Sequence, residues 1–97
     1  MVYTYIVLCA DGTLYTGWSA NVEKRLAAHN AGTGAKYTRN RLPVALVYFE
    51  CQENQSAAQK REASIKKLRR QQKIALIIEF SRIEQGKLIA VPEKIKF

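Results

Sequence analysis

The sequence predicts an α+β fold in which a three-stranded, mainly antiparallel sheet is flanked by helices. Three runs rich in β-branched and aromatic residues, at 2–9, 13–17 and 44–50, indicate strands. The first two runs are separated by a short turn containing Asp11-Gly12, a pair typical of tight β-hairpins. Segments with apolar residues at helical spacing follow the second and third runs. Helices packed on a small sheet are the simplest way to bury the apolar side chains of both.

Three helices are expected after the hairpin. Ser19 is expected to be the N-cap of the first helix, which runs over about 21–30 and ends by Gly32. The second helix begins at Ser56 and covers about 56–69, and the third covers about 71–80. The order is therefore hairpin, helix, strand, helix, helix.

The remaining segments are a loop and a C-terminal extension. Residues 31–43 contain Gly34 and Pro43 as breakers and carry basic but no acidic side chains. Residues 81–97 include the segment GKLIAVP, for which a short extra strand and an ordered tail are both open. We therefore expect one domain over residues 1–80 and an extension over 81–97, since a chain of 97 residues is long enough for one core.

The net charge is the strongest compositional signal. Sixteen Lys and Arg residues against eight Asp and Glu residues give a net charge of +8, and the isoelectric point is near 9.8. A basic excess of this size on a small domain indicates a polyanionic partner, usually nucleic acid. A charge that serves solubility, or contact with a ribosome or a membrane surface, is the alternative.

Other classes of protein are disfavoured by the same composition. Cys9 and Cys51 are too few for a disulfide framework and match no zinc spacing, and Cys9 lies in an apolar run that indicates a small buried side chain. We therefore expect a reducing, cytoplasmic location. No apolar segment has the length of a membrane span, and the first residues lack the basic leader of a signal peptide.

Basic side chains gather in the loop at 31–43 and in the segment at 60–73, where they are expected to contact phosphates. Contacts of this kind position a nucleic acid without reading its sequence. The predicted nucleic-acid-binding residues are Lys36, Arg39, Arg41, Lys60, Lys66, Lys67, Arg69 and Arg70.

Five residues stand out as candidates for chemistry once the elements are placed. Tyr5 and Tyr15 lie on the two strands of the hairpin, Arg25 and His29 share one face of the first helix, and Glu62 is the only acid of the basic second helix. Arginine offers a bidentate fork to phosphate, and a lone carboxylate suits Mg²⁺, which often takes only one or two protein carboxylates. Taken one at a time, these residues are equally consistent with strand aromatics and surface charges, such as a Glu62 that pairs with Lys66.

Two tripeptide-like motifs and one arginine form a recognisable pattern: Tyr5-Ile6-Val7, Leu14-Tyr15-Thr16-Gly17, and Arg25 ten residues after Tyr15. In this pattern the chain resembles the GIY-YIG nuclease superfamily, most closely its small bacterial single-domain members. The resemblance extends through YTGWSANVEKRLAAHNAGTGAKYTR, a following PVALVY strand and a helix of the pattern AxxxExxIKKL, and covers about residues 3–80. The combination is specific, although each tripeptide alone is a weak motif.

The resemblance implies roles for the five residues. Tyr15 is expected to be the general base or to position the attacking water, and Tyr5 to contact the scissile phosphate or assist the water. Arg25 would stabilise the pentacovalent phosphate, His29 would aid proton transfer, and Glu62 would anchor a single divalent cation, Mg²⁺ or Mn²⁺. The expected function is a metal-dependent endonuclease that hydrolyses phosphodiester bonds, structure-directed on DNA and of use in DNA repair.

Two departures from the family pattern keep an alternative open. Trp18 stands where excision-repair members carry a lysine that lowers the pKa of the tyrosine, and Lys36 is the candidate to replace it. No DNA-recognition domain accompanies the motif in these residues. The alternative is a weakly active or inactive nucleic-acid-binding module that works with a partner protein.

Overall fold

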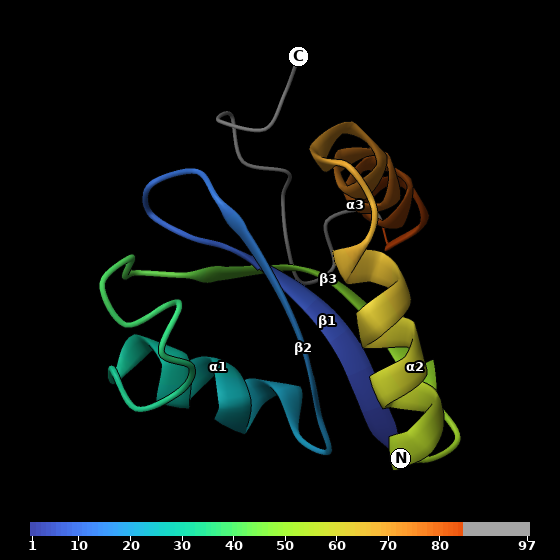
Figure 1. Ribbon diagram of the computed structural model, residues 1–97, viewed down its shortest axis with the longest axis horizontal. Helices are drawn as coiled ribbons and strands as arrows, with labels where there is room; N and C mark the ends of the chain where they lie inside the picture. Colours follow the sequence, from blue (N-terminus) through green and yellow to red (C-terminus); the bar gives the residue numbers. More distant parts are fainter. Residues whose placement is uncertain (85–97) are drawn as a thin grey trace.

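The computed structural model describes residues 1–84, which form three strands and three helices (Figure 1). The elements in chain order are β1 (Val2–Leu8), β2 (Leu14–Ser19), α1 (Val22–Asn30), β3 (Ala45–Gln52), α2 (Gln55–Lys66) and α3 (Arg70–Glu84). The predicted α+β class, with a hairpin followed by helix, strand and two helices, is confirmed.

The sheet has the order β2-β1-β3, and both strand pairs are antiparallel. The hairpin turn contains Gly12 at a φ of 86°, a left-handed conformation that favours glycine. On the other side of β1, the register with β3 shifts between Ile6 and Val7. Because β1 is the central strand, its alternating side chains face two different layers of helices.

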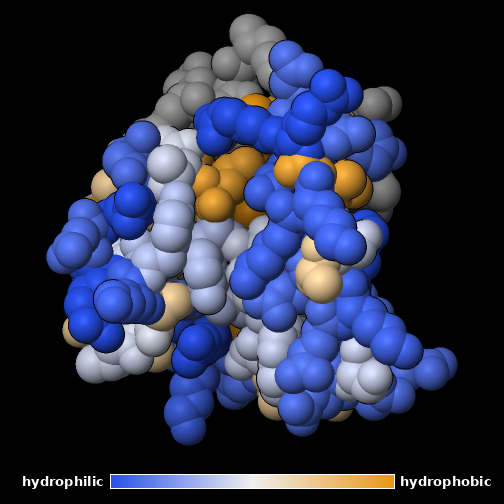
Figure 2. All heavy atoms as spheres, viewed as in Figure 1, coloured by the Kyte–Doolittle hydropathy of each residue, from blue (hydrophilic) through white to orange (hydrophobic). Residues whose placement is uncertain are grey.

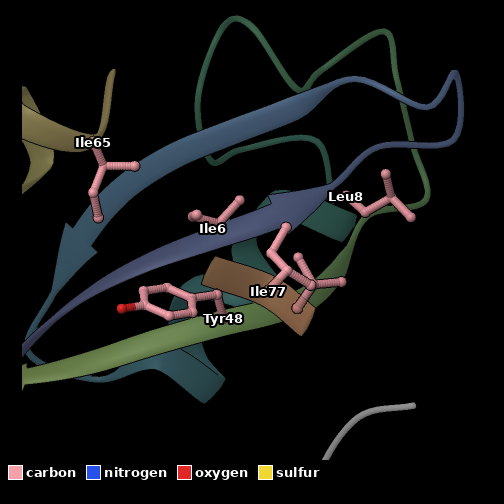
Figure 3. Close-up of a cluster of buried hydrophobic side chains, with 6 residues drawn as sticks. Ile6, Leu8, Tyr48, Ile65 and Ile77 are labelled. Atoms are coloured by element: carbon pink, nitrogen blue, oxygen red, sulfur yellow. The ribbon is translucent and has the colours of Figure 1, made fainter. Parts of the chain in front are cut away.

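One face of the sheet carries the hydrophobic cluster with more fully buried members, beneath α2 and α3 (Figure 1). Figure 3 shows side chains from all these elements meeting on this face, with Ile6 and Leu8 from β1, Tyr48 from β3, Ile65 from α2 and Ile77 from α3. The cluster is almost fully buried. Burial of each such side chain contributes about 1.5–3 kcal/mol, so this face supplies much of the stability of the fold.

The other face of the sheet packs against α1 and the loop that follows it (Figure 1). Tyr5, Val7 and the predicted small buried residue Cys9 lie at its centre. Val22 and Leu26 of α1 pack against them. Tyr5 therefore projects toward the layer that contains α1, whereas its neighbour Ile6 projects into the core beneath α2 and α3.

The prediction that Ser19 caps the first helix is wrong. Strand β2 continues through Ser19, whose hydroxyl accepts a hydrogen bond from the Asn21 amide and donates one to the Asn21 carbonyl, both at 3.1 Å. Asn21 is the N-cap, because its side-chain oxygen accepts a hydrogen bond from the Lys24 amide at 3.0 Å. Serine and asparagine are both favourable N-cap residues. Because β2 extends through Ser19, the helix begins later and Asn21 takes the N-cap position.

The last two helices differ from prediction in their bounds. α2 begins after the N-cap Asn54 and ends at Lys66, earlier than expected, while α3 begins at Arg70 and extends to Glu84. The segment GKLIAVP lies outside the described residues. Within residues 1–84, none of the helices is both long and apolar enough to cross a membrane.

Candidate active site

The hairpin places two tyrosines on the same face of the sheet. Tyr5 of β1 lies opposite Gly17 of β2, and Val7 lies opposite Tyr15. Residues opposite each other in an antiparallel pair share a face, and so do residues two apart along one strand. Tyr5 and Tyr15 are therefore diagonal neighbours on the face covered by α1.

Gly17 provides the space in which the Tyr5 ring lies. A Cβ atom added to Gly17 would stand 2.6 Å from the Tyr5 hydroxyl oxygen, 2.8 Å from its Cζ and 3.3 Å from Cε2 of Tyr15. Any side chain at this position would therefore displace the Tyr5 hydroxyl. Gly17, the last residue of the Tyr15-Thr16-Gly17 motif, is therefore required because of close packing and not because of an unusual backbone conformation.

A buried hydrogen-bond chain runs from Tyr5 into the loop after α1. The Tyr5 hydroxyl lies 2.9 Å from Nε2 of His29, and Nδ1 of His29 lies 2.8 Å from the Thr38 hydroxyl, which donates to the Ala35 carbonyl at 3.1 Å. Since the single Thr38 hydrogen is used on that carbonyl, we assign the hydrogen of the imidazole to Nδ1. Nε2 is then the acceptor of the Tyr5 hydroxyl hydrogen. The Ala35 amide also donates to Nδ1, but this contact, at 3.4 Å, is weaker than the 2.8 Å contact with the Thr38 hydroxyl on which the assignment rests.

The loop at 31–43 holds the imidazole from the side away from Tyr5. A Cβ on Gly34 would stand 2.5 Å from Nδ1 of His29 and 2.8 Å from its Cα. His29 and Thr38 are both 0% exposed. Sequence reasoning identified His29 but not Thr38, because a threonine in an irregular loop carries no local signal of its tertiary partner.

Burial and nearby charges shift the acidities of this chain of groups. Burial raises the pKa of Tyr5 above its ordinary value, although hydrogen bonding and charge from Arg25 oppose it, and the Tyr15 and Glu62 side chains raise it further. Burial, reinforced by the positive charge of Arg25, lowers the pKa of His29 below its ordinary value. His29 is therefore neutral near pH 7 and free to accept a proton. The groups that act on these two pKa values come from four elements, with Tyr5 on β1, Tyr15 on β2, Arg25 and His29 on α1, and Glu62 on α2.

Arg25 carries a buried donor that the described residues leave unsatisfied. Its Nε is inaccessible to solvent and has no hydrogen-bond partner among them. The side chain extends from α1 toward the Tyr5 hydroxyl and His29. A buried, unpaired guanidinium N–H costs free energy unless a ligand completes its hydrogen bonding, and phosphate matches the guanidinium fork.

Lys66 of α2, not Lys36, is the lysine that lies beside Tyr15. Its Nζ is 5.8 Å from the centroid of the Tyr15 ring and 3.0 Å from Oε2 of Glu62. Glu62 and Lys66 are one helical turn apart, so they reach the same edge of β2. The expectation that Lys36 replaces the missing family lysine is not supported by any contact of Lys36 with the site, and Lys36 is exposed.

The carboxylate of Glu62 is the donor available for a divalent cation at this site. Within residues 1–84, no three His, Cys, Asp or Glu side chains are grouped as a metal site. One carboxylate nevertheless fits Mg²⁺ or Mn²⁺, because such ions retain several waters and take substrate phosphate oxygens as further ligands. The donor set is incompatible with a closed, all-protein metal cage.

A stacked group, formed by Tyr15, Tyr37 and Arg41, lies at the outer side of the site. The rings of Tyr15 and Tyr37 are 5.7 Å apart and inclined by 22°, and the Arg41 guanidinium is 4.1 Å from the Tyr37 centroid. Tyr15 also contacts the His29 ring edge-on, at 5.5 Å. The stacked group therefore extends from the buried imidazole to the surface.

The predicted phosphate-binding side chains are mostly available at the surface. Figure 2 shows hydrophilic side chains in two areas, over α1 and its following loop and over α2, with paler surface between them. Arg41 is the exception, because it is half-buried and forms an ion pair with Asp11 at 3.0 Å. The exposed members of the predicted set are Lys36, Arg39, Lys60, Lys66, Lys67, Arg69 and Arg70.

Comparison with known proteins decides the family. The sequence model of the GIY-YIG catalytic domain matches residues 1–75. The chain belongs to the GIY-YIG family. The matched domain is the catalytic domain of a nuclease family, and the resemblance stated from the sequence motifs is confirmed. GIY-YIG membership also supports nucleic acid as the class of ligand.

Relatives of this GIY-YIG chain are UPF0213 proteins. One from Clostridium perfringens (strain 13 / Type A) is 62% identical over 77 residues, which cover 79% of this chain and 83% of that protein. Another, from Haloquadratum walsbyi, is 53% identical over 83 residues, covering 86% of this chain and 93% of that one.

Solved structures agree with the fold. The solution NMR structure of a UPF0213 protein from Bacillus halodurans has a TM-score of 0.55 at 37% identity and covers 91% of this chain and 97% of its own. A solution NMR structure from E. faecalis has a TM-score of 0.51 at 41% identity, with coverages of 93% and 90%. The GIY-YIG arrangement of sheet and helices is therefore shared with these proteins.

Proposed function

We propose that this chain is a metal-dependent endonuclease that hydrolyses phosphodiester bonds, directed by the structure of its DNA substrate. The observation that carries the proposal is the meeting of Arg25, with its unsatisfied buried Nε, and the hydrogen-bonded pair of Tyr5 and His29. An arginine fork can hold a phosphate, and a neutral imidazole beside it can receive a proton. These are two of the requirements for phosphodiester hydrolysis.

The proton of the attacking water is proposed to pass through Tyr5 to His29. As the water oxygen attacks phosphorus, the Tyr5 oxygen takes a water proton and the Tyr5 hydroxyl hydrogen moves to Nε2 of His29, 2.9 Å away. This route avoids a free phenolate, which burial disfavours by raising the pKa of Tyr5. Tyr15 would then position the attacking water, one of the two roles expected from the resemblance.

Phosphate binding would itself make His29 a better base. The charge of Arg25 lowers the pKa of His29 in the free protein. A phosphate on Arg25 would bring negative charge that offsets this effect. The imidazolium formed in the reaction would therefore be most stable when substrate is bound, and Thr38, fixed by the Ala35 carbonyl, would keep the ring oriented.

Glu62 is proposed to hold the divalent cation, Mg²⁺ or Mn²⁺. When bound, the cation would supply positive charge at the leaving oxygen. Lys66, at 3.0 Å from Glu62, keeps the carboxylate near the edge of β2 and adds a positive charge beside Tyr15.

A cleavage assay tests the proposal directly. Single-stranded, duplex, flap and four-way DNA would be incubated with the protein in Mg²⁺, in Mn²⁺ and in a chelator. Wild type should cut at least one branched or flapped substrate only in the presence of metal. Glu62→Gln, Tyr15→Phe and His29→Gln should each lower the single-turnover rate by about 10²- to 10⁴-fold, the range for removal of an acid–base or charge-stabilising group.

The matched control is Tyr3→Phe. Tyr3 lies on the same strand as Tyr5 but packs against Phe49, with ring centroids 6.0 Å apart. This variant should cut at the wild-type rate. If no substrate is cut while salt-sensitive binding persists, the nucleic-acid-binding module with a partner protein becomes the better description.

A further inference from the structure

Tyr37 is an aromatic side chain that the proposed chemistry does not use. It lies in the loop at 31–43 and is 40% exposed, and among the described residues only Met1 is a more exposed large hydrophobic side chain. Its ring stacks with that of Tyr15 and lies under the Arg41 guanidinium. Tyr15 and Arg41 thus both pack on the Tyr37 ring, and the parts of Tyr37 and Arg41 that stay exposed face solvent together at the edge of the proposed site.

Arg41 is fixed in place by three contacts. Its Nε donates to Oδ2 of Asp11 at 3.0 Å, its Nη1 donates to the Tyr37 carbonyl at 2.7 Å, and the guanidinium lies 4.1 Å from the centroid of the Tyr37 ring. The Asp11 carboxylate largely offsets its charge, so Arg41 is a poorer phosphate ligand than the sequence suggested. Its side chain is still 36% exposed.

We propose that Tyr37 and Arg41 form a stacking platform for an unpaired nucleobase next to the phosphate held by Arg25. The inference rests on the proposed function and names its substrate class, DNA with an unpaired or extruded nucleotide beside the cleaved bond. Nucleobases stack on tyrosine rings and on guanidinium planes without regard to sequence. In a continuous duplex each base is already stacked between its neighbours, so only an unpaired base can use the platform without an unstacking cost.

The position of the platform couples it to the site. Tyr15 links Tyr37 to His29 through ring contacts at 5.7 and 5.5 Å. A base stacked on this platform would therefore be connected to the proposed site through Tyr15. Because the platform is already ordered by Asp11, stacking requires little further loss of side-chain freedom.

The platform can be tested by measuring DNA affinity while the protein side chain and the unpaired base are changed separately and together. Two flap DNAs would be compared that are identical except that the unpaired nucleotide at the junction carries adenine or is abasic. Binding would be measured by fluorescence anisotropy in a chelator, so that no cleavage occurs. Wild type should bind the adenine flap about 5- to 150-fold more tightly than the abasic flap, the range expected for stacking of one base.

Variants of Tyr37 and Arg41 distinguish stacking on a base from a role in supporting the fold. In Tyr37→Ala the preference for adenine should disappear while affinity for the abasic flap is unchanged, and Tyr37→Phe should retain the preference. Arg41→Lys keeps the charge but removes the plane, so it should reduce the preference. An equal loss of affinity for both DNAs in Tyr37→Ala would overturn the platform and leave Tyr37 as a support for Tyr15.

The same proteins distinguish this inference from the proposed function. Metal-dependent cleavage without any difference between adenine and abasic flaps would overturn the platform alone. A clear preference for adenine in a protein that cuts nothing would overturn the nuclease and retain the platform. Quenching of 2-aminopurine at the unpaired position gives an independent measure of stacking.

Discussion

At the residue scale, Gly17 shows how a single missing side chain shapes the site. The Tyr5 hydroxyl occupies the volume that a Cβ at position 17 would fill, and it cannot turn away without leaving His29. A clash of this kind within a packed region is relieved by shifts that cost free energy. A glycine at position 17 therefore avoids a steric clash and also keeps the Tyr5 hydroxyl within hydrogen-bond distance of His29, as the proposed proton path requires.

Gly17→Ala is expected to lower the free energy of unfolding by about 1–3 kcal/mol and to reduce cleavage by at least about 10²-fold. Gly12→Ala is the control. Gly12 has a φ of 86° but nothing within 4 Å of an added Cβ, so its replacement should cost about 1 kcal/mol and leave cleavage unchanged. Urea denaturation and single-turnover rates on both variants would separate the two effects, and equal losses of cleavage would contradict the role given to Gly17.

His29 is expected to make stability depend on pH in one defined interval. The chain has a single histidine, and its pKa in the folded protein is below the ordinary 6.5 because of burial and the charge of Arg25. Well above pH 6.5 the imidazole is neutral in both states, so it adds no pH dependence there. As the pH falls below 6.5, the unfolded chain binds a proton that the folded protein does not. The free energy of unfolding should then decrease, by at most about 1.4 kcal/mol per pH unit.

Urea denaturation between about pH 7.5 and pH 5 would measure this slope. His29→Gln should be less stable at every pH but should show a flat profile over the interval. Below the ordinary carboxyl value of 4.5, Glu50 adds a second loss, because its pKa is lowered in the folded protein. A wild-type profile that is level from pH 7.5 to pH 5 would contradict the burial of a neutral imidazole.

At the element scale, α2 is held in register with the sheet by polar contacts. The Thr4 hydroxyl of β1 donates to the Ala58 carbonyl at 3.0 Å, and Arg61 donates to both carboxylate oxygens of Glu50 on β3 at 2.9–3.0 Å. Glu50 also accepts a hydrogen bond from Tyr48, and burial, followed by this carboxylate, raises the pKa of Tyr48 to about 12. These contacts fix the rotation of α2.

Glu50→Gln should destabilise the fold and weaken cleavage together. Arg61 precedes Glu62, so loss of its partner removes a constraint on the carboxylate proposed to bind metal. We expect the free energy of unfolding to fall by about 1.5–3 kcal/mol, as for hydrogen bonds to charged groups, and half-saturation to require more Mg²⁺. Asp11→Asn breaks the more exposed ion pair with Arg41 and should cost less than about 1 kcal/mol. An unchanged metal requirement in Glu50→Gln would show that α2 is positioned by its apolar face alone.

The elements also show how far sequence reasoning reaches. The strands and the hairpin were predictable because β-branched runs and Asp11-Gly12 are local signals. The N-cap was assigned to Ser19 instead of Asn21, because the length of β2 depends on pairing with β1. Tyr5, Tyr15, Arg25, His29 and Glu62 were predicted from their places in the expected elements and from the family resemblance, and the structure puts the His29 ring in contact with both Tyr5 and Tyr15.

What the sequence did not reveal depends on tertiary contacts. Thr38 reaches His29 from an irregular loop, and Lys66, first regarded as a surface partner of Glu62, also lies over Tyr15. The stacking of Tyr37 with Tyr15 joins residues that are distant in the chain. No periodicity or propensity encodes such pairs, since they form only when the loop packs against the hairpin.

At the scale of the whole molecule, the charge of +8 should dominate affinity for DNA. Affinity for duplex DNA should fall with salt, with a slope of log K against log salt of about −0.9 for each phosphate contacted. A triple variant that replaces Lys60, Lys67 and Arg69 with Gln should reduce that slope by about 2–3. Lys24→Gln, at an exposed position of α1, should leave the slope unchanged. A triple variant with the wild-type slope would place the DNA elsewhere.

The central position of β1 has a consequence for how this sequence can vary. Its odd-numbered Tyr5 faces the site, whereas Ile6 and Leu8 face the core beneath α2 and α3. In a saturation mutational scan, selection for abundance alone should accept Phe at position 5 and reject polar residues at positions 6 and 8. Selection for DNA cleavage should in addition reject Phe at position 5. Substitutions within β1 are then limited by two kinds of selection, for stability at Ile6 and Leu8 and for cleavage at Tyr5. A lineage that lost catalysis would be expected to lose the hydroxyl of Tyr5 while keeping positions 6 and 8 apolar.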